Sequence, residues 1–218
     1  MLFDLDDTLL DRNQAVENMF SLIVETCYGT QKQSDEIEML RTFKALDKKD
    51  YGNRNKTNVF ESFFDLYPTT CRLPRNDVQA FWNKHFPQCF TVNEHTIRLV
   101  NTIKMYAKVG MITNGTTQRQ RAKIRNTHLQ HCFDTIIISE EVGLSKPDKR
   151  IFELALSKLN VQPEETLFVG DDIERDIGGC QDAQIKGLWF NPHRIKNETD
   201  IIPYDEIHSI ARVVRYVR

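Results

Sequence analysis

Helical and strand-like segments alternate along the chain from about residue 90 onward. The strand-like runs cover residues 108–113, 135–139, 166–169 and 186–190. Apolar residues with helical spacing precede or separate these runs, over residues 96–106, 117–127, 148–159 and 173–182. Strands that are joined through helices pair in parallel, because the chain must cross back over the sheet before it adds a neighbouring strand. The pattern therefore predicts an α/β fold, with a Rossmann-like parallel sheet as core and crossover helices.

The remaining segments complete the predicted layout. Leu2 to Asp4 is expected to be a first strand of the same sheet, and residues 205–218 one terminal helix whose core-facing residues are Ile207, Ile210, Ala211, Val214 and Val217. Residues 12–88 show helical periodicity and contain most of the aromatic residues. This pattern predicts a small bundle with helices over residues 15–28, 35–46, 58–67 and 76–86. We expect a catalytic core of residues 1–11 and 89–218, with residues 12–88 inserted as a helical cap domain.

The composition narrows the class of protein. The 218 residues carry a formal net charge of −2, which gives no strong field for binding a nucleic acid polymer. No apolar run reaches the roughly 20 residues that a membrane span needs, and the N-terminus lacks a secretory signal pattern. The five cysteines are scattered and are expected to be reduced and mostly buried. We expect a cytoplasmic protein, a monomer or homodimer, without a membrane or nucleic-acid partner.

Carboxylates follow the first predicted strand. Asp4 and Asp6 stand two residues apart after the apolar run, and Thr8 follows at the same spacing. In open α/β sheets, ligands bind beyond the carboxyl ends of the strands, so these residues lie where a site is expected. Two buried carboxylates need compensating charge, and their hard oxygen atoms suit Mg²⁺.

Three more segments end in polar residues that could meet the first. Thr113-Asn114-Gly115 closes one strand, and a helix that Thr116 or Thr117 could cap follows it, so that free backbone N–H groups would face an anion. The other two segments contribute Lys146, just before a proline, and the acidic run with Asp171, Asp172 and Asp176. Each residue alone has an ordinary structural explanation, such as a helix cap, a turn or a solvated charge.

Taken together and in this order, the four segments resemble the motifs of the haloacid dehalogenase-like hydrolase superfamily. The resemblance covers essentially the whole chain and implies a phosphatase with a helical cap between its first and second motifs. It implies that Asp4 is the nucleophile, that Asp6 is the general acid and base, and that Thr113, Asn114, Gly115 and Lys146 hold the phosphoryl group. It also implies a Mg²⁺ site made by Asp4, Asp171 and the backbone carbonyl of Asp6, with Asp172 or Asp176 supporting Lys146 or the metal's water shell.

The expected activity is therefore Mg²⁺-dependent hydrolysis of small phosphomonoesters, of the nucleotide or sugar-phosphate type, through an aspartyl-phosphate. Dehalogenases of the family generally lack an acid at the position of Asp6. A phosphomutase that transfers the phosphoryl group on a sugar phosphate is the alternative, although the sugar-phosphate mutases often carry Gly-Val at the positions of Asp7 and Thr8. A signalling receiver is disfavoured, because its phosphorylated Asp lies on a later strand and it lacks a long helical insertion.

One loop of the predicted cap is a candidate for reading the substrate. Residues 47–56 are polar, contain Gly52 and join two predicted helices, and Asn53 and Arg54 are the candidate contacts. A solvated loop with no role in binding is the alternative interpretation of the same residues.

Overall fold

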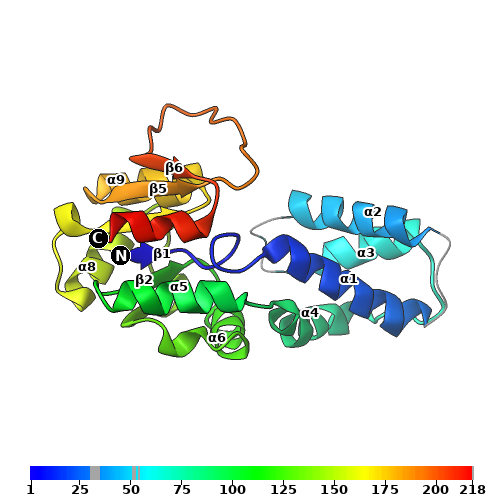
Figure 1. Ribbon diagram of the computed structural model, residues 1–218. Helices are drawn as coiled ribbons and strands as arrows, with labels where there is room; N and C mark the ends of the chain where they lie inside the picture. Colours follow the sequence, from blue (N-terminus) through cyan, green and yellow to red (C-terminus); the bar gives the residue numbers. More distant parts are fainter. Residues whose placement is uncertain (30–34, 51–52, 54, 218) are drawn as a thin grey trace. The chain divides into compact units, whose positions relative to one another are not determined.

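The computed structural model describes residues 1–29, 35–50, 53 and 55–217 of the chain. By contacts within the chain it divides into two compact units, one made of Met1–Asp11 and Thr91–Arg218 and the other of Arg12–Phe90 (Figure 1). Within the described residues, no helix has the length and apolar character that crossing a bilayer requires.

The first unit is built on a parallel sheet of six strands in the order β3-β2-β1-β4-β5-β6. The strands are β1 (Leu2–Phe3), β2 (Gly110–Thr113), β3 (Thr135–Ile138), β4 (Leu167–Gly170), β5 (Lys186–Phe190) and β6 (Asp205–Ile207). All five neighbouring pairs run in parallel. The predicted α/β class and parallel sheet are confirmed, and the two-residue strand β1 lies at the centre with β2 and β4 on either side.

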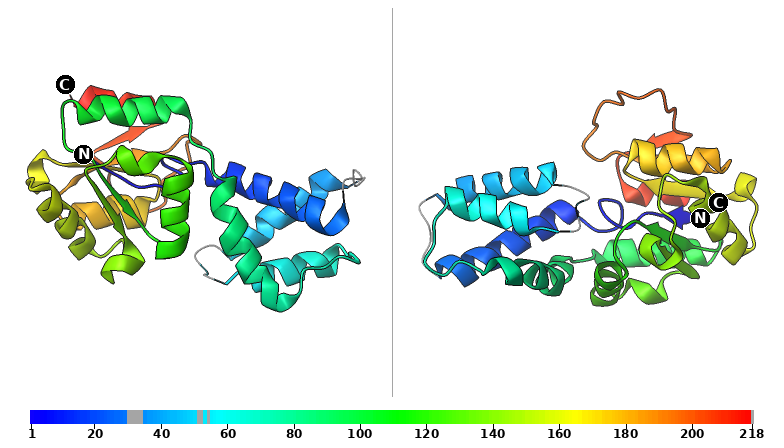
Figure 2. Two further views of the ribbon diagram at one scale, coloured as in Figure 1. Left: turned by 90° about the horizontal axis from the view of Figure 1, so that it is seen from below. Right: turned by 180° about the vertical axis from the view of Figure 1, so that it is seen from behind.

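Helices cover both faces of this sheet. They are α5 (Glu94–Lys104), α6 (Thr117–Asn126), α7 (Ser139–Val142), α8 (Lys149–Leu159) and α9 (Gly179–Asp182). The left view of Figure 2 shows α5 and the C-terminal segment on one side of the sheet and α8 with α9 on the other. The core under α8 and α9 is apolar and includes the fully buried side chains of Leu2, Ile112 and Phe168. Because the chain leaves β1 in one direction and later returns to add β4, the crossovers place helices on opposite faces.

The predicted terminal helix is wrong. Residues Asp205–Ile207 form the edge strand β6, and a 3₁₀ helix follows over Ile210–Tyr216. Apolar residues here recur every three positions, which is the period of a 3₁₀ helix and is easily taken for the 3.6-residue period. Val213 is fully buried in consequence, whereas Ala211, which the prediction placed in the core, is exposed.

The helix predicted near residues 173–182 is irregular. It begins as a π-helix over Ile173–Gly178 and continues as α9. The Asp172 side chain caps its start by accepting hydrogen bonds from the backbone N–H groups of Glu174 and Arg175. The wider turn lies directly after β4, where it places Asp176 beneath the strand end.

The second unit is a small helical bundle. Its helices are α1 (Arg12–Tyr28), α2 (Glu36–Lys49), α3 (Thr57–Leu66) and α4 (Arg75–His85), and a 3₁₀ turn follows at Phe86–Cys89. Phe43 lies at the centre of an aromatic core, with ring centroids 5.4 Å from Phe63, 5.9 Å from Phe60 and 6.0 Å from Phe20. The four predicted helices therefore exist, and in their common core Phe43 packs edge to face with Phe60 and Phe63 and at a tilt against Phe20.

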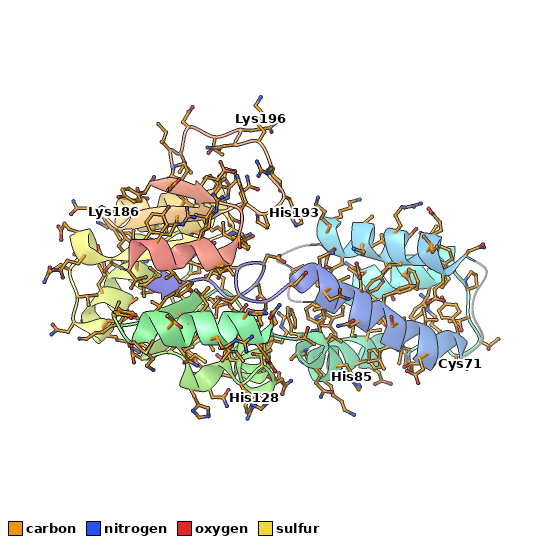
Figure 3. All side chains as sticks on the ribbon, viewed as in Figure 1. Cys71, His85, His128, Lys186, His193 and Lys196 are labelled. Carbon is orange, nitrogen blue, oxygen red and sulfur yellow. The ribbon has the colours of Figure 1, made fainter. Side chains whose placement is uncertain are left out.

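The described cysteines are all free thiols. Cys27, Cys132 and Cys180 are buried, while Cys71 is exposed on the helical unit (Figure 3). This agrees with the expected reduced cysteines that mostly fill apolar space.

Candidate active site

Asp4 and Asp6 lie where the chain leaves the centre of the sheet. The Asp4 N–H donates to the Val169 carbonyl at 2.9 Å, which continues the pairing of β1 with β4. The chain then turns back on itself, because the N–H groups of Leu9 and Leu10 both donate to the Leu5 carbonyl, at 3.0 and 2.9 Å. This closed loop anchors the apolar residues and presents the side chains of Asp6 and Thr8 at the end of the sheet.

Lys146 is the cation of the site. Its Nζ lies 2.5 Å from Oδ1 of Asp4 and 2.6 Å from Oδ1 of Asp176, and its side chain is only 4% exposed. Asn114 fixes the Lys146 backbone with two hydrogen bonds of 2.9 Å, donating from Nδ2 to the carbonyl and accepting at Oδ1 from the N–H. Burial alone would lower the pKa of Lys146, but Asp176 and Asp4 outweigh it and raise the pKa, so the ammonium stays charged.

The carboxylates of Asp4, Asp171 and Asp176 form one group, with an oxygen of each within 4.8 Å of the others. Asp171 is held by a hydrogen bond from Thr8 Oγ1 to its Oδ1 at 3.2 Å and by Trp189 Nε1, which donates to its carbonyl at 2.8 Å. Two strand ends and the π-helix thus bring these acids together. Asp4, Asp171 and Lys146 are predicted site residues, and the fold places them side by side.

The electrostatics of this group favour a bound cation. Burial raises the pKa of Asp4 to about 7, against the opposing effect of Lys146, and Asp176 adds to the rise. Burial also raises the pKa of Asp171 to about 8, with Asp4 and Asp176 contributing. Three carboxylates beside Lys146 would carry excess negative charge when all are ionised, and a divalent cation would neutralise that charge in place of the protons. The hard oxygen donors of this group fit Mg²⁺.

The two candidate supporting acids differ in their contacts. Asp176 is buried and pairs with Lys146, and its Oδ2 accepts a 3.2 Å hydrogen bond from the Asp172 N–H. The Asp172 side chain instead caps the π-helix and contacts Arg175 Nε at 2.6 Å. A Cβ at Gly170 would lie 2.3 Å from Asp176 Oδ2, so this position must be glycine for the carboxylate to fit.

Thr113 and Asp6 are joined by residues that sequence reasoning missed. Gln120 Nε2 donates to Thr113 Oγ1 at 2.6 Å and to Asp6 Oδ2 at 3.0 Å. Lys123 Nζ lies 2.8 Å from both oxygens of the Asp6 carboxylate. In the sequence, the helix around them is rich in Arg and Lys and is typical of a solvated face. The available signal was the spacing of Gln120 and Lys123 with the buried Ile124 and Thr127, which places all four on one helix face.

The expected cradle of free N–H groups is wrong at two positions. The Gly115 N–H donates to Ser139 Oγ at 2.9 Å, and the Thr117 N–H donates to Glu140 Oε2 at 2.7 Å. A protein carboxylate therefore already lies at the start of α6, in the place that the prediction reserved for an anionic ligand. Gly115 is still required by its backbone, since its φ of +146° is rarely adopted by other residues.

The candidate substrate-reading loop is only partly described. Arg54 lies outside the described residues. Asn53 is exposed, donating from Nδ2 to Asp50 Oδ1 at 3.1 Å and accepting from the Asn55 N–H at 3.1 Å. These contacts shape the turn, and a role in binding stays a prediction.

The two ends of the same loop belong to a buried ion cluster. The Asp47 carboxylate, 1% exposed, lies 2.7 Å from Arg12 Nη2 and 3.2 Å from Lys56 Nζ. Lys56 also lies 3.0 Å from Asp50 Oδ2. These charges hold the start of α1 to the α2–α3 connection, so Asp47 and Lys56 have structural partners of their own.

Among the described residues, no histidine belongs to the group of Asp4, Asp171 and Asp176. His128 and His193 have exposed side chains on the surface of the first unit (Figure 3). The clustered groups that could transfer protons or attack a substrate are therefore carboxylates, with lysines beside them.

Comparisons with known proteins place the chain among hydrolases. A family model described as haloacid dehalogenase-like hydrolase matches residues 1–190. Pyrimidine 5'-nucleotidase YjjG of Escherichia coli (strain K12) is 38% identical over 222 residues, covering 96% of this chain and 93% of the relative. A glyceraldehyde 3-phosphate phosphatase of Pyrococcus abyssi (strain GE5 / Orsay) is 31% identical over 208 residues, covering 87% of this chain and 80% of the relative.

Solved structures share the fold. The HAD-hydrolase YfnB from Bacillus subtilis, bound to magnesium, superposes with a TM-score of 0.79 at 23% identity, covering 100% of this chain and 97% of the other. L-2-haloacid dehalogenase from Xanthobacter autotrophicus superposes with a TM-score of 0.68 at 15% identity, covering 100% and 97%. Enzymes of different chemistry therefore share this architecture, and the activity has to be argued from the site.

Proposed function

The chain belongs to the haloacid dehalogenase-like hydrolase family, and on that premise we propose that it is a Mg²⁺-dependent phosphatase of small phosphomonoesters that works through an aspartyl-phosphate on Asp4. The observation that carries this proposal is the buried group of Asp4, Asp171 and Asp176 around Lys146. Such a group is costly to bury without a ligand, and it supplies the nucleophile and the positive charge that a dianionic phosphate ester needs.

Asp4 is the proposed nucleophile. One of its carboxylate oxygens attacks phosphorus, the new O–P bond forms, and the bond to the leaving alcohol breaks with its electron pair staying on that oxygen. Asp6 gives the leaving oxygen a proton and then takes a proton from the water that attacks the aspartyl-phosphate. The second step restores the Asp4 carboxylate and releases inorganic phosphate.

The other residues neutralise and orient. Lys146 offsets charge on the phosphoryl group and on Asp4, and Asp176 keeps that ammonium group in place. The Thr113 hydroxyl donates to a phosphoryl oxygen. Asp4, Asp171 and the Asp6 carbonyl would hold Mg²⁺, which supplies further positive charge against the phosphate when bound.

The substrate class rests on the relatives. The named relatives are phosphoric monoester hydrolases, a pyrimidine 5'-nucleotidase and glyceraldehyde 3-phosphate phosphatases. We infer a small phosphorylated metabolite of the nucleotide or sugar-phosphate type. A cytoplasmic location, a monomeric or homodimeric state and the lack of a nucleic-acid or membrane partner stay predictions. Light scattering on the purified protein tests the oligomeric state.

A phosphate-release panel tests the proposal. The purified chain is incubated with 4-nitrophenyl phosphate, nucleoside 5'-monophosphates, and triose and hexose phosphates, with Mg²⁺ or with a chelator. We expect release from at least one class with Mg²⁺, loss with the chelator and recovery when Mg²⁺ is restored. Full release in the chelator contradicts the metal-dependent mechanism. Conversion of a sugar phosphate to its isomer with little phosphate release would instead support the phosphomutase alternative.

A further inference from the structure

Two buried polar side chains on α6 connect the proposed acid and base to the proposed phosphoryl-binding hydroxyl. Gln120 is 2% exposed and Lys123 is 5% exposed. Both contact the Asp6 carboxylate, and Gln120 also contacts Thr113. Neither residue belongs to the group of acids around Lys146. Burying a lysine and an amide on the core-facing side of a helix is costly, so these side chains need a reason to be there.

The Asp6 carboxylate settles which way the Gln120 amide points. In its ionised form, paired with Lys123, the Asp6 carboxylate only accepts hydrogen bonds, so the amide group 3.0 Å from Asp6 Oδ2 is then the NH₂ and not the carbonyl oxygen. The same NH₂ then has its second hydrogen for Thr113 Oγ1, at 2.6 Å. Thr113 is thereby made an acceptor toward Gln120, and its own O–H proton is directed to another acceptor. A phosphoryl oxygen is an acceptor of the required kind.

Lys123 fixes the carboxylate itself. Its Nζ is 2.8 Å from both Oδ1 and Oδ2 of Asp6, which defines the plane and rotation of that carboxylate. Because the lysine is on the same helix face as Gln120, one rigid element sets both contacts. A carboxylate on a turning loop would otherwise sample several rotamers, and proton transfer needs it within hydrogen-bond reach of the reacting oxygen.

We propose that Gln120 and Lys123 are positioning residues of the phosphatase reaction: Lys123 orients Asp6 for proton transfer, and Gln120 sets Thr113 as the hydrogen-bond donor to the phosphoryl group. The inference rests on the proposed function. It assigns no contact with the substrate to either residue, and it divides their effects between two different parts of the reaction.

The first test separates leaving-group protonation from general damage. Protonation matters most when the leaving oxygen is a poor leaving group, so Lys123→Met should reduce kcat/KM for an alkyl phosphate far more than for 4-nitrophenyl phosphate. The alkyl phosphate is the nucleoside 5'-monophosphate or sugar phosphate that wild type hydrolyses fastest. We expect about a 10²-fold loss for the alkyl phosphate and about a 10-fold loss or less for the aryl phosphate. Lys123→Arg, which keeps a donor to the carboxylate, should recover part of the loss.

The matched control for this variant is Lys104→Met. Lys104 also pairs with an aspartate of the same unit, at 3.0 Å from Asp134 Oδ1, but outside the site. Lys104→Met should leave kcat/KM unchanged for the alkyl phosphate and for the aryl phosphate, and therefore also the ratio of the two. An unchanged ratio of alkyl to aryl kcat/KM in Lys123→Met contradicts the positioning of Asp6. If Lys123→Met does not fold, Lys123→Arg decides. A smaller loss that is still greater for the alkyl than for the aryl phosphate supports the proposal, and a wild-type ratio or an equal loss on both substrates contradicts it.

The second test concerns Thr113. Gln120→Met keeps the length of the side chain and adds no charge beside Asp6, but it removes the donor to Thr113, so the Thr113 hydroxyl is no longer fixed as the donor to the phosphoryl group. We expect competitive inhibition by inorganic phosphate to weaken about 10-fold or more. Gln118→Met, the same change at an exposed position of the same helix, is the control, and phosphate should inhibit it as strongly as it inhibits wild type. Unchanged phosphate inhibition in a folded Gln120→Met contradicts the assignment.

The two proposals can fail separately. If wild type with Mg²⁺ hydrolyses neither substrate, the proposed function fails, and the positioning roles fail with it. If wild type is active but the Lys123 and Gln120 variants follow their controls, only the positioning roles are overturned.

Discussion

At the residue scale, the chemistry depends on the shared charge of the three clustered carboxyl groups of Asp4, Asp171 and Asp176. Asp4 and Asp171 both have raised pKa values because they are buried near each other, and Lys146 offsets only part of that charge. Asp6, two residues after Asp4, lies outside this group and faces Lys123. The two acids of the first motif therefore have different surroundings, which suits one for attack and the other for proton transfer.

Asp6→Asn tests this division of roles. The amide keeps the size of the side chain and leaves the backbone carbonyl in place, so Mg²⁺ binding measured by titration calorimetry should persist. Turnover should fall about 10²-fold to 10⁴-fold, because the variant cannot supply or accept the proton. Full activity in Asp6→Asn would overturn the assignment.

The sequence predicted Asp4, Asp6, Thr113, Lys146 and Asp171 as site residues from their order at the strand ends and from the family resemblance. The fold brings Asp4, Lys146 and Asp171 together. Sequence reasoning missed Gln120 and Lys123. A lysine in a helix dense with basic residues is normally solvated, and only the tertiary fold shows that this one reaches Asp6 from across the sheet end.

At the scale of elements, β4 and the π-helix after it act as one unit. The strand ends at Gly170, and the wide turn returns the Asp176 carboxylate to a position 2.3 Å from where a Gly170 side chain would begin. The absence of a side chain at this residue is therefore what allows Asp176 to reach Lys146. The close approach of Asp176 to Gly170 therefore accounts both for the end of β4 and for the ion pair between Asp176 and Lys146.

Gly170→Ala should displace Asp176 and weaken its hold on Lys146. We expect the free energy of unfolding to fall by about 1–3 kcal/mol, as for other overpacking changes. We also expect kcat to fall, because Asp176 then holds Lys146 less firmly. Urea unfolding and steady-state kinetics measure the two effects.

Gly29→Ala is the comparison, since Gly29 has a φ of +80° but no atom within 4 Å of an added Cβ. It should cost about 1 kcal/mol through backbone strain alone and leave kcat unchanged. Normal kcat in Gly170→Ala would show that Asp176 is dispensable.

The elements that were predicted well are those with an unambiguous period. The strands were short apolar runs between helical segments, and the helices of residues 12–88 had apolar residues three or four positions apart or ended at prolines. The chain end was ambiguous, because Ile210, Val213 and Tyr216 fit a three-residue period, and β6 contains only one apolar residue, Ile207. An edge strand of this kind is fixed by pairing with β5, which no local pattern reveals.

At the scale of the whole molecule, the chain consists of two units with separate cores. The carboxylates of the proposed metal site all belong to the unit of residues 1–11 and 91–218, and the aromatic core around Phe43 belongs to the other. Ligand binding to one unit stabilises that unit directly, so unfolding need not be a single two-state transition.

The raised pKa values of the proposed metal site predict how stability depends on pH and how Mg²⁺ changes that dependence. With raised pKa values of about 7 and 8, Asp4 and Asp171 hold protons in the folded metal-free protein that the unfolded chain has already lost. Their contribution to stability therefore falls as pH rises from about 4 to 8. Mg²⁺ competes with those protons, so the rise in Tm on adding Mg²⁺ should be larger at pH 8 than at pH 6. Mg²⁺ at 100 times its Kd should add about 2.7 kcal/mol. An equal rise at both values of pH, followed by calorimetry, would contradict the proposed site.

If Asp4 carries the phosphoryl group during turnover, chemical trapping should detect it on that residue. The enzyme is mixed with Mg²⁺ and its best substrate, quenched in acid during turnover, and treated with borohydride, which reduces an aspartyl-phosphate to homoserine. Peptide mass spectrometry should find homoserine at position 4 in wild type and not in a sample without Mg²⁺. Homoserine at another aspartate, or intact Asp4 throughout rapid turnover, would contradict the account.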